Sequence, residues 1–230
     1  MKALFAGFAL LLAAAPAVAA PKPAARIAPT DHRATVLETS EGWTFGKAGA
    51  PLLVEYASYG CPQCGRVAAE TTGRVDELVK AGKLRFAWRP FLIFPQDRAA
   101  AILTRCVAPR RRLAFIETLM AEQSAIKAAL RAADENEASR ARLYEAELAG
   151  PVSHAAEIAK AAGLLTLAQK FGLNTVQAGT CLASPAHHAW ATNADATARL
   201  NRVTGTPTFF WKGGKLPAGT PADLLALLPR

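Results

Sequence analysis

The sequence of 230 residues predicts an α/β fold in which a long helical segment interrupts a group of strands. Three patterns indicate this. An apolar run at 52–57 precedes a segment of helical spacing, and an alternating run at 84–88 follows it, which together describe a βαβ unit. Residues 96–202 are rich in Ala and Leu and contain no convincing strand pattern. After them, residues 206–211 return to a strand pattern.

Residues 1–20 have the pattern of a cleavable signal peptide. Lys2 gives a positive start, 4–15 are an unbroken apolar stretch, and Ala-Val-Ala at 17–19 offers the small residues that precede a cleavage site. The alternative is an N-terminal membrane anchor, although the apolar stretch is short for a span. We expect export to the periplasm and a flexible Pro/Ala-rich leader over 21–33.

The formal net charge of +9 raises the question of a nucleic-acid partner. The positive residues are scattered, and their one cluster, 110–112, follows Pro109 and is expected to be a solvated helix start. No aromatic residues interleave with this cluster, as a groove for single strands would require. We therefore expect no nucleic-acid partner.

The first predicted elements lead to a buried strand. Residues 34–39 alternate weakly, which favours an edge strand, and 42–51 contain three glycines, which favour a turn. The nearly continuous apolarity of 52–57 is typical of a strand covered on both faces. Glu55 shares a face with Leu53 and points to the interior, where burial raises a carboxyl pKa and allows proton transfer. The alternative is an ordinary salt-bridged or exposed glutamate.

Cys61-Pro62-Gln63-Cys64 opens the helix that follows this strand. Apolar spacing at Val67, Thr71, Val75 and Leu78 predicts one buried helix face. Pro62 suits the first helical position, so the Cys61 sulfur lies at the helix N-terminus, where a thiolate is stabilised. The pattern is typical of a redox dithiol. A zinc site would need a second ligand pair, and Cys106, Cys181 and the adjacent His187-His188 do not have that spacing.

The remaining segments continue the pattern. Residues 84–88 predict a strand parallel to the first, Pro90 and Pro95 interrupt the chain, and 96–202 predict about five or six helices. Pro207 removes a donor from the strand at 206–211, so it either begins an edge segment or follows a cis bond. Lys212-Gly213-Gly214-Lys215 predicts a hairpin turn, and 220–223 have capping-box spacing before a last helix.

Cys106 and Cys181 form a leftover pair in the helical segment. In an oxidising compartment such a pair usually bonds, and a loop of 75 residues (181 minus 106) would then be closed. The alternative is two buried free thiols that pack as small hydrophobic groups. We expect the disulfide, with a structural role.

Two segments carry a resemblance to a known family. Residues 54–64 (Val-Glu-Tyr-Ala-Ser-Tyr-Gly-Cys-Pro-Gln-Cys) resemble the active-site segment of DsbA-like thiol–disulfide oxidoreductases, a DsbA/DsbG-type family. Residues 205–210 (Gly-Thr-Pro-Thr-Phe-Phe) are similar to its cis-proline segment. The resemblance implies a thioredoxin fold with an inserted helical domain. It implies a thioredoxin-like domain at 34–92 and 203–230 and a helical domain at 93–202.

The resemblance also implies roles for the residues. Cys61, Cys64 and Glu55 match the family's catalytic groups; Pro62, Gln63, Thr206 and a cis Pro207 match its substrate-binding segment. Cys106 and Cys181 resemble a structural disulfide of one branch of the family. No metal and no cofactor beyond the redox-active disulfide are implied.

The implied function is that of an exported oxidoreductase that introduces disulfides into secreted proteins. A quinone-linked membrane partner would reoxidise it, and a monomer is expected. DsbA has His where this chain has Gln63, and a neutral amide stabilises the Cys61 thiolate less than an imidazolium would, so we expect a less oxidising couple. The alternatives are a periplasmic disulfide reductase or isomerase, and a non-catalytic binding or chaperone module.

Overall fold

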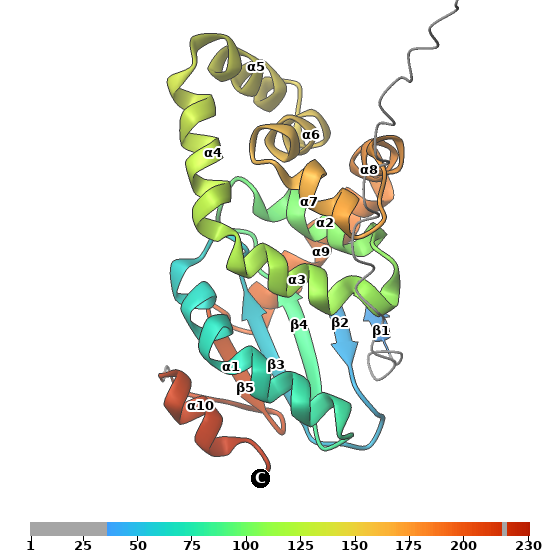
Figure 1. The fold of residues 1–230 in the computed structure, drawn as a ribbon, viewed down its shortest axis with the longest axis vertical. Coiled ribbons are helices and arrows are strands. Elements are labelled where there is room, and N and C mark those ends of the chain that lie inside the picture. The colour runs from blue at the N-terminus through green and yellow to red at the C-terminus, as the bar shows by residue number, and fades with distance from the viewer. Residues whose placement is uncertain (1–35, 218–219) are drawn as a thin grey trace, which may run out of the picture.

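A six-stranded mixed sheet forms one half of the molecule (Figure 1). The computed structural model describes residues 36–217 and 220–230, so the predicted signal peptide and leader lie outside the described residues. The strands are β1 (Val36–Thr39), β2 (Gly42–Phe45), β3 (Leu52–Ala57), β4 (Arg85–Pro90), β5 (Thr208–Trp211) and β6 (Gly214–Lys215). Their order is β1-β2-β4-β3-β5-β6, which makes β1 an edge strand, as predicted.

The βαβ unit is confirmed. β3 and β4 are parallel, and the other neighbouring pairs are antiparallel. The helices are α1 (Pro62–Lys80), α2 (Asp97–Cys106), α3 (Arg112–Ala121), α4 (Gln123–Glu135), α5 (Glu137–Leu148), α6 (Pro151–Ala161), α7 (Leu164–Lys170), α8 (Thr175–Leu182), α9 (Pro185–Leu200) and α10 (Pro221–Leu227), with a 3₁₀-helix at Pro109–Arg111. No helix in the described part of the chain is long and apolar enough to cross a membrane.

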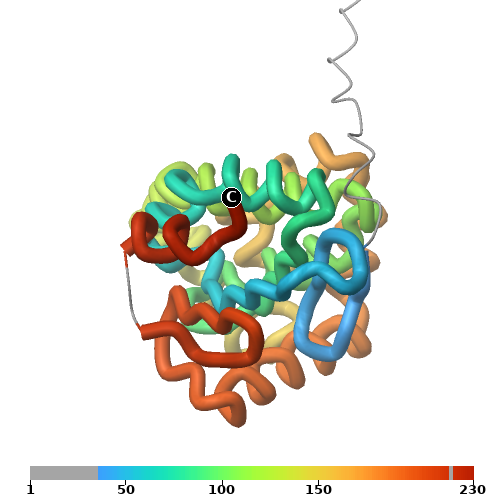
Figure 2. The backbone as a smooth tube through the Cα atoms, turned by 90° about the horizontal axis from the view of Figure 1, so that it is seen from below, coloured from blue at the N-terminus to red at the C-terminus, as the bar shows by residue number. Residues whose placement is uncertain are grey.

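Helices cover both faces of the sheet (Figure 2). α1 and α10 lie side by side on one face, and α9 packs against β4 on the other. The alternation of β3 agrees with this arrangement, because Leu53 and Glu55 face α1, whereas Tyr56 packs with Phe91 and Ala198 in a small cluster on the α9 side. The predicted interior orientation of Glu55 is therefore confirmed.

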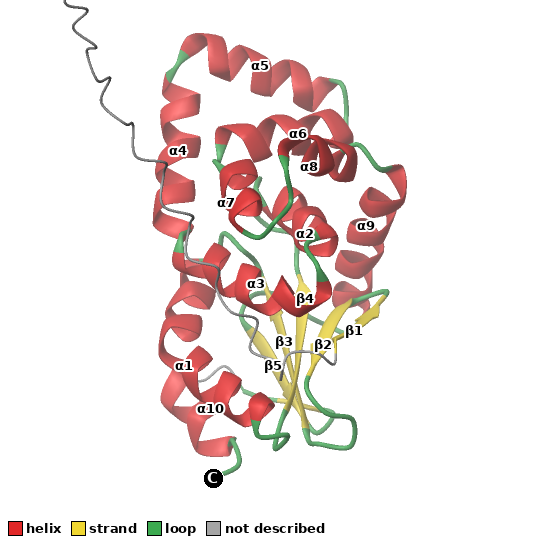
Figure 3. Cartoon of the chain, turned by 45° about the vertical axis from the view of Figure 1, so that its right-hand side comes forward, coloured by secondary structure: helices red, strands yellow, loops and turns green. Residues whose placement is uncertain are grey.

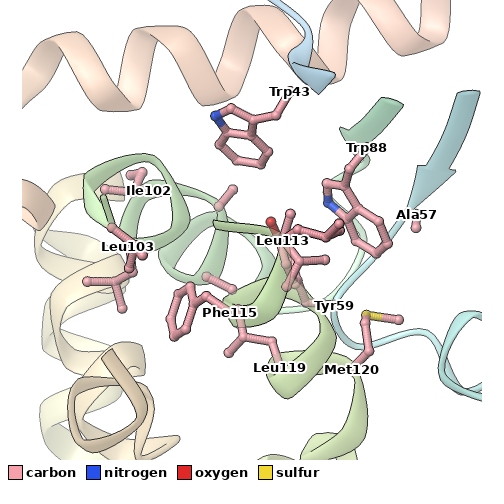
Figure 4. Close-up of a cluster of buried hydrophobic side chains, with 14 of the residues drawn as sticks. Trp43, Ala57, Tyr59, Trp88, Ile102, Leu103, Leu113, Phe115, Leu119 and Met120 are labelled. Atoms are coloured by element: carbon pink, nitrogen blue, oxygen red, sulfur yellow. The ribbon is translucent and has the colours of Figure 1, made fainter. Parts of the chain in front are cut away.

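The remaining helices gather at one end of the sheet (Figure 3). One hydrophobic cluster runs from the sheet through α1 and α3 into these helices. Figure 4 shows part of it, where Trp43 and Trp88 of the strands and Leu113 and Phe115 of α3 belong to one cluster of buried side chains. Each fully buried large apolar side chain contributes about 1.5–3 kcal/mol. The division of the chain at 92 and 203 stays a prediction.

Two expectations for the elements were wrong. Residues 42–45 were expected in a turn, but they form the buried strand β2, where Gly42 has φ 145° and an added Cβ would collide with the Trp88 carbonyl oxygen. The absence of a side chain at Gly42 thus lets β2 and β4 approach each other closely. Between β4 and β5, the described residues hold eight α-helices rather than five or six, in part because Glu122 separates α3 from α4 without a Gly or Pro signal.

The basic cluster at 110–112 is not wholly solvated. Arg112 is only 8% exposed, and it donates to Glu38 Oε2 at 2.6 Å and to the carbonyl oxygens of Arg105 and Val107. Arg105 donates to the other Glu38 oxygen at 2.8 Å. An arginine in a cluster can therefore anchor the edge strand to the helices, which a count of charges does not reveal.

Cys106 and Cys181 form the expected disulfide, which joins the end of α2 to α8. Replacing both residues with Ala should lower the free energy of unfolding by about 2–4 kcal/mol, because the bond restricts a long loop in the unfolded chain. Urea denaturation measures this difference. A C61A/C64A variant, which keeps the long-range bond, is the control. A loss below about 0.5 kcal/mol, within the range of an ordinary surface change, would contradict a stabilising role.

Candidate active site

The Cys61 sulfur lies at the N-terminus of α1. Cys61 is the N-cap residue, Pro62 occupies the first turn, and the Cys64 backbone N–H donates to Cys61 Sγ at 3.4 Å. The Cys61 residue is 6% exposed. The free N–H groups and the dipole of the helix favour negative charge at this sulfur. The placement predicted from Pro62 and the helical spacing is confirmed, including the buried face at Val67 and Leu78.

A second segment, distant in sequence, meets the dithiol. Cys61 Sγ lies 3.3 Å from the Thr206 carbonyl oxygen, to which its protonated form donates a hydrogen bond, across 145 residues of sequence separation. The Thr206–Pro207 peptide bond is cis. The Thr206 hydroxyl is buried beside the two cysteines, where it acts to lower the pKa of both. The structure therefore brings the CxxC segment and the predicted cis-proline segment together.

The two cysteines, which are not bonded to each other here, differ in acidity. A hydrogen bond from the Cys64 thiol, supported by the backbone N–H groups of Cys64 and Gln63, lowers the pKa of Cys61 to about 5, although burial opposes the shift. The pKa of Cys64 is raised by the same hydrogen bond to Cys61, by burial, and by the nearby charge of Glu55. The pair thus holds one thiolate, on Cys61, and one thiol, on Cys64.

Glu55 lies beneath the dithiol as a buried acid. Burial, together with the negative charge of Cys61, raises the pKa of Glu55 to about 8. Its Oε1 has no hydrogen-bond partner, and the side chain lines a cavity of about 30 Å³ with Thr71 and Met120. A carboxyl group in such surroundings holds its proton near neutral pH and can exchange it with a neighbouring thiolate.

A groove extends from the dithiol along β5 and β6. Its lining includes Gln63, Thr206, Pro207 and Phe209, and its volume is about 880 Å³. Phe209 also lines a second groove, of about 300 Å³, that leads to α10. Gln63 accepts a hydrogen bond from the exposed Arg66. Of the four residues predicted to bind substrate, Gln63, Thr206 and Pro207 line this groove. Pro62 directly follows the nucleophile, but it is exposed and lies outside the lining.

Cys106 and Cys181 form a separate site. His187 Nδ1 lies 3.5 Å from Cys106 Sγ and 3.4 Å from Cys181 Sγ. These three side chains are the one group of metal-ligand type found within the described residues, and its two sulfurs are bonded to each other. The pair joins α2 to α8, whereas the dithiol lies at the start of α1.

Two residues near the dithiol were not predicted from the sequence. Asp97, in the first turn of α2, binds the Gly60 backbone, and Gln123, the first residue of α4, binds the Cys61 carbonyl oxygen. Asp97 had one signal, because an acidic residue shortly after Pro95 is typical of a helix start. Gln123 had none, since it begins a helix that no sequence signal separates from the one before it.

The family is shown by comparison with known proteins. The family model described as Thioredoxin matches residues 38–229, and this chain belongs to that family. A search of the curated proteins finds no match. A protein-disulfide isomerase from Novosphingobium aromaticivorans is 26% identical with a TM-score of 0.69, and the alignment covers 83% of this chain and 98% of that one.

Two further solved structures share the fold. Alpha-DsbA1 from Wolbachia pipientis is 16% identical, with a TM-score of 0.59 and coverage of 86% of this chain and 94% of that one. The MdbA thiol-disulfide oxidoreductase from Actinomyces oris is 20% identical, with a TM-score of 0.54 and coverage of 82% and 85%. The expected thioredoxin fold with a helical insertion and the resemblance to DsbA-like proteins are confirmed. The enzyme class is that of the protein thiol–disulfide oxidoreductases.

The raised pKa of Glu55 predicts a pH dependence of stability. Its pKa is about 8 in the folded protein against an ordinary value of 4.5. Between these values the unfolded chain binds fewer protons, so ionisation of Glu55 destabilises the fold as pH rises. Relative to Glu55→Gln, the wild type should lose up to about 1.4 kcal/mol of unfolding free energy per pH unit in this window.

Urea denaturation between pH 5 and 8 on the oxidised proteins measures this difference. The Cys61–Cys64 bond removes both thiols from the titration and with them the Cys61 charge, so burial alone raises the pKa of Glu55 in these proteins. Every group other than Glu55 is common to the two variants. Parallel stability curves for the wild type and Glu55→Gln would contradict a raised pKa of Glu55.

Proposed function

We propose that this protein is an exported thiol–disulfide oxidoreductase that introduces disulfides into secreted proteins through Cys61 and Cys64. The observation that carries the proposal is the difference in acidity between these cysteines, with the pKa of Cys61 lowered to about 5 and that of Cys64 raised. A stabilised Cys61 thiolate favours the reduced form of the pair, and a pair with a stable reduced form is an oxidant.

The proposed reaction begins with the oxidised pair. A substrate thiolate attacks Cys61 Sγ, the Cys61–Cys64 bond breaks, and Cys64 leaves as a thiolate. Because the pKa of Cys64 is raised, this thiolate takes up a proton. Glu55 holds a proton below about pH 8 and lies close enough to affect the pKa of Cys64, so we propose that it donates this proton.

The second step completes the transfer of two electrons. A second substrate thiolate attacks the substrate sulfur of the mixed disulfide, the new substrate disulfide forms, and Cys61 leaves as a thiolate. Its low pKa makes Cys61 a good leaving group. We propose that the groove along Gln63, Thr206 and Pro207 holds the substrate chain during both steps.

The cellular setting is proposed from the sequence and the family. The signal-peptide pattern of 1–20 supports a periplasmic location, and the substrates are reduced or unfolded secreted proteins. Return to the oxidised state needs an acceptor for two electrons, and a quinone-linked membrane partner is proposed for this role from the resemblance. We expect the protein to act as a monomer.

An isomerase is the second candidate. The solved structure with 26% identity is described as a protein-disulfide isomerase. An isomerase must leave the mixed disulfide without net oxidation, so it works best from the reduced form. Reactivation of a scrambled substrate by the reduced protein, without oxidation of reduced substrate by the oxidised protein, would favour this second function.

Serine substitutions test the proposed roles of the two cysteines. Cys61→Ser should abolish oxidation of a reduced substrate, because no sulfur remains for the substrate to attack. Cys64→Ser should also lose this oxidation, since it has no Cys61–Cys64 bond. Its Cys61 thiolate should, however, attack oxidised glutathione, release one glutathione thiolate and keep the mixed disulfide, because Cys64 is no longer present to displace the bound glutathione. The fluorescence change of a peptide that closes a disulfide measures the first, and mass spectrometry measures the second. C106A/C181A is the control and should keep the activity; turnover by Cys61→Ser would refute the assignment.

A further inference from the structure

The peptide segment Gly60–Cys61 is held at its N-terminal end by a buried carboxylate. Asp97 is fully buried, and its Oδ1 accepts from the Gly60 backbone N–H at 3.1 Å. Its Oδ2 accepts from the Ser58 hydroxyl and from the backbone N–H groups of Ile93 and Phe94, each at 2.8 Å. Burial raises the pKa of Asp97 to about 6, although these hydrogen bonds lower it. One side chain thus joins the turn before the nucleophile to the loop before α2.

The same segment is held at its C-terminal end by an amide. Gln123 Nε2 donates to the Cys61 carbonyl oxygen at 3.1 Å, and this oxygen also accepts the Gly65 backbone N–H of the first helical turn, at 3.1 Å. Gln123 comes from α4, whereas Asp97 comes from α2. The helical segment therefore contacts the nucleophile's backbone at two points.

Two glycines make these contacts possible. A Cβ at Gly60 would collide with the Phe94 and Gln96 side chains that pack on this turn. A Cβ at Gly65 would collide with Gln123 Oε1. Gly65 lies inside a helix, where Ala is intrinsically more favourable by about 1 kcal/mol. The absence of a side chain at Gly65 instead lets Gln123 approach the helix closely.

We propose that Asp97 and Gln123 are positioning residues that hold Gly60 and Cys61 so that the Cys61 sulfur stays at the helix N-terminus. The proposal rests on the proposed function, since it assigns the two residues to the nucleophile. The hydrogen bond from the Cys64 backbone N–H to Cys61 Sγ is already long, at 3.4 Å, so it is sensitive to the position of the sulfur. A small displacement of the backbone at Cys61 therefore removes a donor that stabilises the thiolate.

The direction of the shift in the Cys61 pKa distinguishes a positioning role from a simple effect of charge. Asp97 has a pKa of about 6, so its negative charge is present only in part where Cys61 titrates, and by charge alone Asp97→Asn would lower the pKa of Cys61 or leave it unchanged. Displacement of Cys61 raises that pKa, because the thiolate then moves away from the N–H groups that stabilise it. For Gln123→Ala no charge changes, and the expected shift is again upward.

The experiment follows the Cys61 thiolate of the reduced full-length protein by its absorbance at 240 nm against pH. A C106A/C181A background removes the other two cysteine sulfurs from the titration, and the raised pKa of Cys64 keeps that thiol out of the range. We expect Asp97→Asn and Gln123→Ala each to move the Cys61 midpoint upward by about half a pH unit or more, and to slow mixed-disulfide formation about tenfold, since misplaced reactive groups lose rate steeply.

Two further variants control the result. Gln169→Ala removes a glutamine of the same helical segment, whose amide donates to Thr175 at 2.7 Å, and should leave the midpoint unchanged. Gly65→Ala should reproduce the midpoint shift of Gln123→Ala without loss of thermal stability, and the double variant should add no further shift, because both changes remove one contact.

Each outcome decides the proposal. A folded Gln123→Ala variant with a wild-type Cys61 midpoint overturns it for Gln123, and Asp97→Asn with an unchanged or lowered midpoint overturns it for Asp97. If Asp97→Asn does not fold, Gln123→Ala and Gly65→Ala decide. Failure of the proposed function is distinguishable, because the wild type would then fail to oxidise a reduced substrate while the midpoint shifts remained.

Discussion

The contact between Cys61 and the Thr206 backbone is the constraint on which the rest of the structure depends. It joins two segments 145 residues apart. β3 ends shortly before Cys61 and β5 begins directly after Pro207, so the antiparallel pairing of these two strands brings the segments to the same end of the sheet. β4 occupies the other side of β3, and the long helical segment must leave and return at this one end of the sheet.

A single negative charge is shared among three acids at this site. Cys61 raises the pKa of Glu55 by its charge, and Glu55 in turn raises the pKa of Cys64. Because the interior stabilises charge poorly, only the group with N–H donors, Cys61, ionises readily. The other two keep their protons near neutral pH. The same arrangement that activates the attacking sulfur therefore keeps a proton available for its partner.

The sequence predicted the local parts of this site and missed the contacts between distant parts. The position of Cys61 could be predicted because proline and helical periodicity act within a few residues of it. Gly42 was misassigned to a turn, since only its strand partner reveals the close approach. Asp97 and Gln123 could not be assigned to the dithiol, because their contacts cross 37 and 62 residues of chain. The resemblance supplied the pairing of the CxxC and proline segments, which periodicity alone leaves open.

The reduction potential of the Cys61–Cys64 pair tests the central claim most directly, measured against glutathione in a C106A/C181A variant. The pKa of Cys61 is lowered, but the neutral Gln63 stands where DsbA has a His that stabilises the thiolate. We predict a potential between about −120 mV, the value of DsbA, and about −180 mV, that of protein disulfide isomerase. A potential near that of thioredoxin, about −270 mV, would contradict the account, because the pair would then be a reductant.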